Sequence, residues 1–186
     1  REGVNQYGDP VDILESGYVR FYELLGFIPK TISNFTKNVE MIFNKKRDLL
    51  IVVGGGSLPP QLYDRPHEDE LQPNRDRMEE QVIHYCVAHG IPIIATCRGM
   101  QYINVMFGGK LWYHPKLPVN RTRGVDHQVW LVKEQRNIWV NNYHSDCIYE
   151  EGLASCFEPL AIDRENHVVE AYGSDEMKIL ALQWHP

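Results

Sequence analysis

The chain has 186 residues, of which 43% are hydrophobic and 24% are charged, and its net charge is −6 at pH 7. This length favours a single domain over residues 1–186, and the acidic balance argues against nucleic acid or an anionic membrane as a partner. No apolar run approaches the ~20 residues that a membrane-spanning helix needs. The four cysteines form no CxxC pair and do not suggest a disulfide framework, so we expect a reducing, cytoplasmic location. Because the chain begins without Met and stops after a strand-like run, we expect both ends to be trimmed.

The first quarter of the chain predicts two helices and two strands. Residues 1–9 are polar and predict a loop, and Asp9-Pro10 predicts the start of a helix, because Asp is a good N-cap and Pro fits the first helical position. A short strand is expected over 27–32 and a second helix over 36–46. The apolar run 48–53 predicts a buried parallel strand, since it is hydrophobic on both faces.

Gly54, Gly55 and Gly56 follow that strand. They allow positive φ angles or a close approach of the backbone to another group. They do not form a phosphate loop, since no Gly-Lys-Ser/Thr sequence comes next. On this pattern alone an ordinary strand-to-loop turn is the simpler interpretation. The proline-rich stretch 57–73 predicts a long loop, and loops of this length are often functional.

The middle of the chain repeats the order of helix and strand. Asn74 is expected to cap a helix that carries Cys86 on its packed face, and residues 91–95 predict a buried strand. A further helix is expected over 100–107. The order predicts an α/β fold, a three-layer sandwich around a mostly parallel central sheet. In such sheets a ligand binds at the carboxyl ends of the strands.

Cys97 lies between the strand at 91–95 and the following helix. Small residues stand two positions before it and two after it, at Ala95 and Gly99. A nucleophile elbow requires this spacing, because the reactive residue sits on a tight, strained turn where large neighbours would clash. The helix N-terminus also favours a thiolate. A buried packing cysteine remains the alternative interpretation at this point.

The C-terminal half is rich in strands and is expected to be antiparallel in part. Residues 164–166 predict a hairpin turn between two of the strands. The strands are expected over 127–132, 138–140, 158–162, 167–172 and 179–184.

A cysteine nucleophile needs a base, and histidine is the usual one. His185 follows the last predicted strand and His144 ends another, and spacing alone does not choose between them. No pair of histidines has the spacing of metal ligands, so we expect no metal site.

Four motifs occur in order along the chain: Cys97-Arg-Gly-Met-Gln101 with Asn104, Phe107-Gly-Gly-Lys-Leu111, Val140-Asn-Asn-Tyr-His144 and Gln183-Trp-His-Pro186. Together they resemble the class I glutamine amidotransferase-like superfamily. More narrowly, the chain resembles the γ-glutamyl hydrolase branch of this superfamily, the peptidase C26 group, because an arginine directly follows the cysteine. The resemblance implies a flavodoxin-like α/β fold and hydrolysis of a small γ-glutamyl compound without a cofactor.

The resemblance also implies roles for single residues. Cys97 would attack the γ-carbonyl of a γ-glutamyl amide, and His185 would transfer protons. The family's third triad member is a Glu two residues after the histidine, a position beyond Pro186, so either the chain continues into this Glu or the triad is degraded. Backbone N–H groups would form the oxyanion hole and three further residues would line the substrate site; these are Gly55 or Gly56 with Arg98, and Gln101, Tyr143 and His144.

Three functions stay open at this stage. The first is a free-standing γ-glutamyl hydrolase, the second a glutaminase subunit that supplies ammonia to a synthase partner, and the third a catalytically silent binding module. Arg98 and the lack of a synthase domain favour the first. Residues 57–73 and 112–126 are expected to wall the leaving-group pocket, with an ordinary solvated surface as the alternative. The oligomeric state, including a homo-oligomer, is left open.

Overall fold

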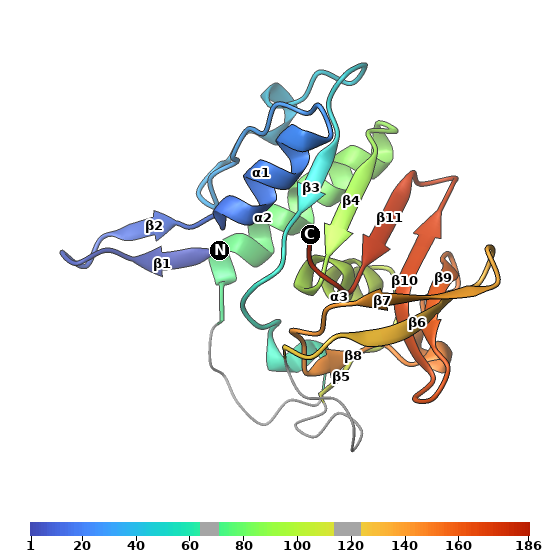
Figure 1. The fold of residues 1–186 in the computed structure, drawn as a ribbon. Coiled ribbons are helices and arrows are strands. Elements are labelled where there is room, and N and C mark those ends of the chain that lie inside the picture. Colours follow the sequence, from blue (N-terminus) through green and yellow to red (C-terminus); the bar gives the residue numbers. More distant parts are fainter. Residues whose placement is uncertain (64–70, 114–123) are drawn as a thin grey trace.

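The computed structural model describes residues 1–63, 71–113 and 124–186 (Figure 1). A seven-stranded sheet has the strand order β3-β4-β11-β10-β9-β6-β7. The strands are β3 (Leu50–Val52), β4 (Ile93–Thr96), β6 (His127–Leu131), β7 (Arg136–Val140), β9 (Glu158–Asp163), β10 (Val168–Ser174) and β11 (Ile179–Leu182).

Helices cover both faces of the sheet at its β3 end. Helices α2 (Pro73–Ala88) and α3 (Arg98–Met106) pack on β3, β4 and β11. On β4, Ile93 and Ala95 belong to the core cluster that these helices share. Thr96 points to the other face, because side chains alternate along a strand, and there its side chain meets the hydroxyl of Tyr22 from α1 (Ser16–Leu24). The predicted α/β class and layered sheet are confirmed.

The sheet is mixed, with fewer parallel pairs than expected. Parallel pairing joins β3 to β4 and β4 to β11, whereas β11, β10, β9, β6 and β7 pair antiparallel in that order. Short turns connect β9 to β10 and β10 to β11, and a short turn can join only antiparallel neighbours. The predicted turn at 164–166 is confirmed; there Asp163 accepts hydrogen bonds from Glu165 N and Asn166 Nδ2. The five strands predicted in this half are confirmed within one or two residues at most ends.

The N-terminal prediction of a loop followed by a helix at Pro10 is wrong. Residues 1–12 contain a hairpin of β1 (Glu2–Val4) and β2 (Pro10–Asp12), which projects from the body in Figure 1. Asp9 does not cap a helix, because its side chain and carbonyl accept bonds from Asn5 in the hairpin turn. Helix α1 begins only at Ser16.

Two further predictions in this region are wrong. Residues 27–32 form no strand, since Pro29 lacks an N–H and no described strand pairs with this segment. The helix expected over 36–46 is only the short 3₁₀ helix η1 (Val39–Met41), which has no buried residue to anchor it. The chain then turns at Asn44, whose side chain accepts a bond from Lys46 N.

The strands and helices around Cys97 are confirmed, with shifted ends. Helix α2 starts at Pro73, and Asn74 does not cap it because its amide contacts Glu2. Cys86 is fully buried in the core, as predicted, and burial raises its pKa to about 12. Shorter elements are η2 (Pro60–Leu62), η3 (Glu150–Gly152) and the antiparallel pair β5 (Trp112–Tyr113) and β8 (Asp146–Cys147). Within the described ranges, no helix combines the length and the apolar character needed to cross a membrane.

Candidate functional site

Cys97 occupies the sharp bend between β4 and α3. Its backbone has φ 52° and ψ −111°, a conformation rare for a residue with a side chain. Its N–H donates to the Leu182 carbonyl at 2.7 Å, which ties the bend to β11. A Cβ on Gly99 would lie 2.6 Å from the Val52 carbonyl oxygen, so only glycine allows α3 to start this close to β3. These features are the geometry of a nucleophile elbow.

A cavity of about 430 Å³ lies over Cys97 at the carboxyl ends of the parallel strands. The structure places all eight residues predicted for the site on its wall. They are Cys97, His185, Gly55, Gly56, Arg98, Gln101, Tyr143 and His144, together with Arg1, Glu15, Ser57, Ser145, Asp146 and Pro186.

Cys97 and His185 meet at Gly54. The point where a Gly54 side chain would begin lies 2.7 Å from His185 Cε1 and 3.2 Å from Cys97 Cβ, so the two side chains flank this glycine. Asn141, which follows β7, fixes the backbone of His185 by two bonds. Its Oδ1 accepts from His185 N at 2.9 Å and its Nδ2 donates to His185 O at 2.8 Å.

Tyr18 of α1 contacts the other side of the His185 ring. Its hydroxyl lies 3.1 Å from His185 Nδ1 and accepts the Gly54 N–H at 3.0 Å. Burial raises the pKa of Tyr18, and the nearby Cys97 raises it further, so the phenol keeps its proton. A neutral hydroxyl therefore faces Nδ1.

Gly55 and Gly56 have φ angles of 86° and 81°, which only glycine adopts readily. The Arg98 side chain points away from the cavity and pairs with Glu79 and Asp76. Any contact of Arg98 with a substrate therefore involves its backbone N–H, as the resemblance implies.

The three predicted substrate residues also line the cavity. Gln101 is nearly buried and donates from Nε2 to the Asp146 carbonyl and to Gln183 Oε1, both at 3.1 Å. His144 Nδ1 contacts the same Asp146 carbonyl at 2.9 Å. The ring of Tyr143 is half exposed at the rim and meets the His185 ring edge-on.

The sequence reasoning missed Tyr18, Asn141 and Asp146. Asn141 belongs to a motif that carried the resemblance, so its place before His144 was a signal, although its bond to His185 was not foreseeable. Tyr18 looks like any residue on the apolar face of a helix, and only the fold brings it to His185.

The loops expected to wall the leaving-group pocket lie partly outside the described residues, at 64–70 and 114–123. Ser57 from the first loop lines the cavity. Trp112 does not line it and packs instead on Tyr149 and against Gly152.

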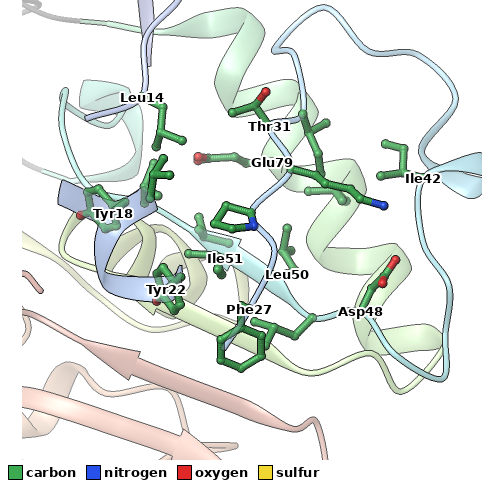
Figure 2. Close-up of a pocket in the computed structure, with 18 of the residues that line it drawn as sticks. Leu14, Tyr18, Tyr22, Phe27, Thr31, Ile42, Asp48, Leu50, Ile51 and Glu79 are labelled. Carbon is green, nitrogen blue, oxygen red and sulfur yellow. The ribbon is translucent and has the colours of Figure 1, made fainter. Parts of the chain in front are cut away.

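A larger hollow of about 570 Å³ runs along the outer edge of β3 (Figure 2). Leu50 and Ile51 of β3 form one wall, and Tyr18, Tyr22 and Phe27 contribute to the others. Its lining includes neither Cys97 nor His185, so we place the candidate site in the smaller cavity. Among the described residues, no cluster of three or more His, Cys, Asp or Glu side chains could hold a metal ion.

Comparisons with known proteins identify the family and the fold of the chain. The sequence matches the peptidase C26 family over residues 2–186. It is 27% identical to protein NtpR of Enterococcus hirae, over 96% of this chain and 83% of that protein. It is 26% identical to the γ-glutamyl-γ-aminobutyrate hydrolase PuuD of Escherichia coli, over 80% of this chain and 66% of that protein. The chain thus spans just under two thirds of the length of PuuD.

A solved structure shows the same fold. It is that of a protein assigned as a GMP synthase subunit from Thermoplasma acidophilum, with a TM-score of 0.66, 22% identity and coverage of 91% of this chain and 76% of that one. The fold is that of class I glutamine amidotransferases. With the family match over nearly its whole length, the chain belongs to the peptidase C26 family.

Proposed function

We propose that the protein hydrolyses the γ-glutamyl amide bond of a small γ-glutamyl compound through a thioester on Cys97. The observation that carries this proposal is the strained bend at Cys97, which opens onto a cavity with His185 alongside. The hydrolase PuuD supports the substrate class, since its name gives a γ-glutamyl amide as the bond it cleaves. A panel of γ-glutamyl substrates identifies the amine that leaves.

The contacts of His185 determine which of its ring nitrogens transfers protons. Tyr18 Oη has two lone pairs and can accept both the Gly54 N–H and a proton held on His185 Nδ1. Nε2 is then the basic nitrogen. It takes the thiol proton of Cys97 as the sulfur adds to the γ-carbonyl carbon, and it returns this proton to the nitrogen of the leaving amine as the C–N bond breaks. Water then attacks the thioester with His185 again as base, which releases glutamate and the free thiol.

The carbonyl oxygen becomes negatively charged in each addition step. Gly55, Gly56 and Arg98 line the cavity. In this proposal the backbone N–H groups of Gly55 or Gly56 and of Arg98 stabilise the charged oxygen. Gln101 and His144 line the same cavity and would hold the amino-acid head of the γ-glutamyl group. This arrangement needs no cofactor.

The test is glutamate release by the protein alone, with a panel of γ-glutamyl amines, γ-glutamyl amino acids and glutamine. We expect release from at least one γ-glutamyl amine, and none from the variant Cys97→Ala with an unchanged fold. The matched control is Cys156→Ala, which removes an exposed cysteine and keeps full activity. Activity in Cys97→Ala contradicts the mechanism.

The substrate panel, together with labelling of Cys97, separates the two other functions. A glutaminase subunit would prefer glutamine and would respond to a synthase partner. A silent binding module would show no turnover and no labelling of Cys97 by a glutamine-like diazoketone.

A further inference from the structure

Arg75 is a fully buried arginine that the proposed mechanism does not use. It lies in the first turn of α2, and its guanidinium donates to three successive backbone carbonyls at the end of β3. Its Nη2 donates to Val53 O at 2.5 Å, and its Nη1 donates to Gly55 O at 2.7 Å and to Gly54 O at 3.3 Å. A single side chain thus sets the direction of three peptide groups.

This contact has a consequence on the opposite side of the loop. In a trans peptide the C=O of one residue and the N–H of the next point in opposite directions. Because the Gly54 and Gly55 carbonyls face Arg75, the N–H groups of Gly55 and Gly56 face away from it. The Gly54 N–H shows the same geometry, since it points away from Arg75 and donates to Tyr18. Gly55 and Gly56 line the cavity that contains Cys97, and the side of the loop turned away from Arg75 is the one that can present their N–H groups to it.

Glu79 joins this loop to the residue after the nucleophile. One of its oxygens accepts from Arg75 Nε at 2.6 Å and the other from Arg98 Nη1 at 2.5 Å, and its side chain is buried. Arg98 also pairs with Asp76. Burial would raise the pKa of the Glu79 carboxyl, but the charges of Arg98 and Arg75 outweigh this effect and lower it.

We propose that Arg75 and Glu79 are positioning residues for the oxyanion hole. Arg75 holds the Gly54–Gly56 loop with two N–H groups toward the cavity, and Glu79 fixes that loop relative to Arg98, whose N–H is the other donor. This inference rests on the proposed function and extends it to the charged cluster beneath the site. A purely structural role explains the burial of the pair, yet it does not require the guanidinium to bind the carbonyls of this one loop.

The test separates formation of the oxyanion from formation of the thiolate. Arg75→Met and Glu79→Gln are assayed for γ-glutamyl-p-nitroanilide hydrolysis and for alkylation of Cys97 by iodoacetamide, which needs the thiolate but forms no oxyanion. Losing one oxyanion donor typically costs about 10²–10³-fold in rate, so we expect kcat to fall about 10²-fold in Arg75→Met with little change in KM or in alkylation. Arg75→Lys retains a donor for one carbonyl and is expected to fall between the wild type and Arg75→Met.

The matched controls are Arg77→Met and Glu80→Gln, which remove exposed charges of the same kinds from the same helix. Both are expected to keep wild-type kcat. Wild-type kcat in Arg75→Met overturns the inference. So does a parallel loss of hydrolysis and alkylation in the folded Arg75→Lys variant, because the effect would then not be specific to the oxyanion.

Failure of the proposed function gives a different result. In that case the wild-type protein releases glutamate from no γ-glutamyl amide, and the inference is decided by a crystal structure of Arg75→Lys or Arg75→Met. Turned Gly54–Gly55 and Gly55–Gly56 peptides support it, and peptides that keep their direction overturn it.

Discussion

Cys97 adopts a backbone conformation that costs about 1–3 kcal/mol, and its neighbours maintain it. Its N–H is bonded to Leu182 of β11, and its carbonyl accepts the first bond of α3 from Gln101 N. The sheet and the helix therefore both depend on this bend. Cys86 shows the alternative fate of a cysteine in this fold, since it lies fully buried in the core with a raised pKa. The strained turn is what directs the Cys97 thiol to the cavity instead.

Tyr18→Phe tests the contact between the Tyr18 hydroxyl and His185 Nδ1. The change removes a hydroxyl that lies 3.1 Å from His185 Nδ1 and accepts the Gly54 N–H. A neutral hydrogen bond contributes about 0.5–1.5 kcal/mol, so we expect kcat to fall roughly 3- to 10-fold with little change in KM. Steady-state hydrolysis of a γ-glutamyl amide checks this.

Tyr22→Phe is the control for this prediction. Tyr22 lies one turn further along α1, and its hydroxyl meets Thr96 outside the cavity over Cys97. Its loss is expected to lower the melting temperature slightly and to leave kcat unchanged. Equal losses of kcat in the two variants would show that the effect comes from α1 as a whole and not from the contact with His185.

How much of the site the sequence could predict depends on which interactions are local. Ala95 and Gly99 predict the elbow at Cys97, because an elbow is a local structure. His185 was one of two candidates on spacing alone, and the resemblance chose it. Tyr18 and Arg75 could not be predicted, since each reaches the site only through the packing of a helix on a distant loop.

At the scale of elements, α3 meets β3 through Gly99. Replacing it by alanine would put a methyl carbon 2.6 Å from the Val52 carbonyl oxygen, so helix and strand must move apart. Despite the better helix propensity of alanine, we expect Gly99→Ala to destabilise the fold by about 1–3 kcal/mol. Urea unfolding of the purified variant measures this. Gly17→Ala in α1 is the control, because nothing lies near its side-chain position, and there we expect a gain of up to about 1 kcal/mol.

The elements that the sequence predicted well have a hydrophobic pattern within their own residues. Strand β3 is a continuous apolar run, and α2 has a periodic apolar face, so both formed where expected. The helix predicted at Pro10 is wrong because Asp9, which fits a helix cap, lies instead in the turn of the β1–β2 hairpin. The segment 27–32 failed because a strand exists only where a neighbour accepts its backbone bonds, and no local pattern specifies that neighbour.

At the scale of the whole molecule, the parallel and antiparallel parts of the mixed sheet contribute to the site in different ways. The parallel strands β3, β4 and β11 bring Gly54, Cys97 and His185 to one edge. The antiparallel strands contribute from the side, where Asn141 at the end of β7 holds the backbone of His185. The site is therefore assembled from both halves of the chain, and its geometry depends on the stability of the whole fold.

That stability is expected to fall at alkaline pH, and Cys86 gives the clearest contribution. Its pKa is raised by burial from 9.0 to about 12, so between these values the unfolded thiol loses its proton while the folded one keeps it. The folded state then binds more protons, and the free energy of unfolding falls by up to about 1.4 kcal/mol per pH unit above pH 9. Buried tyrosines such as Tyr18 and Tyr102, whose pKa values are also raised by burial, act in the same direction at still higher pH.

Urea unfolding of the wild type and of Cys86→Val between pH 7 and pH 10.5 tests this contribution under reducing conditions. Below pH 8 the thiol is protonated in both states, so the two stability curves should run parallel and provide the internal control. Above pH 9 the wild type should lose stability faster than Cys86→Val, by up to about 1.4 kcal/mol for each pH unit, because only the wild type carries a thiol that ionises on unfolding. Curves that stay parallel across the whole range would mean that Cys86 ionises equally in both states and that its burial does not limit the alkaline stability of the protein.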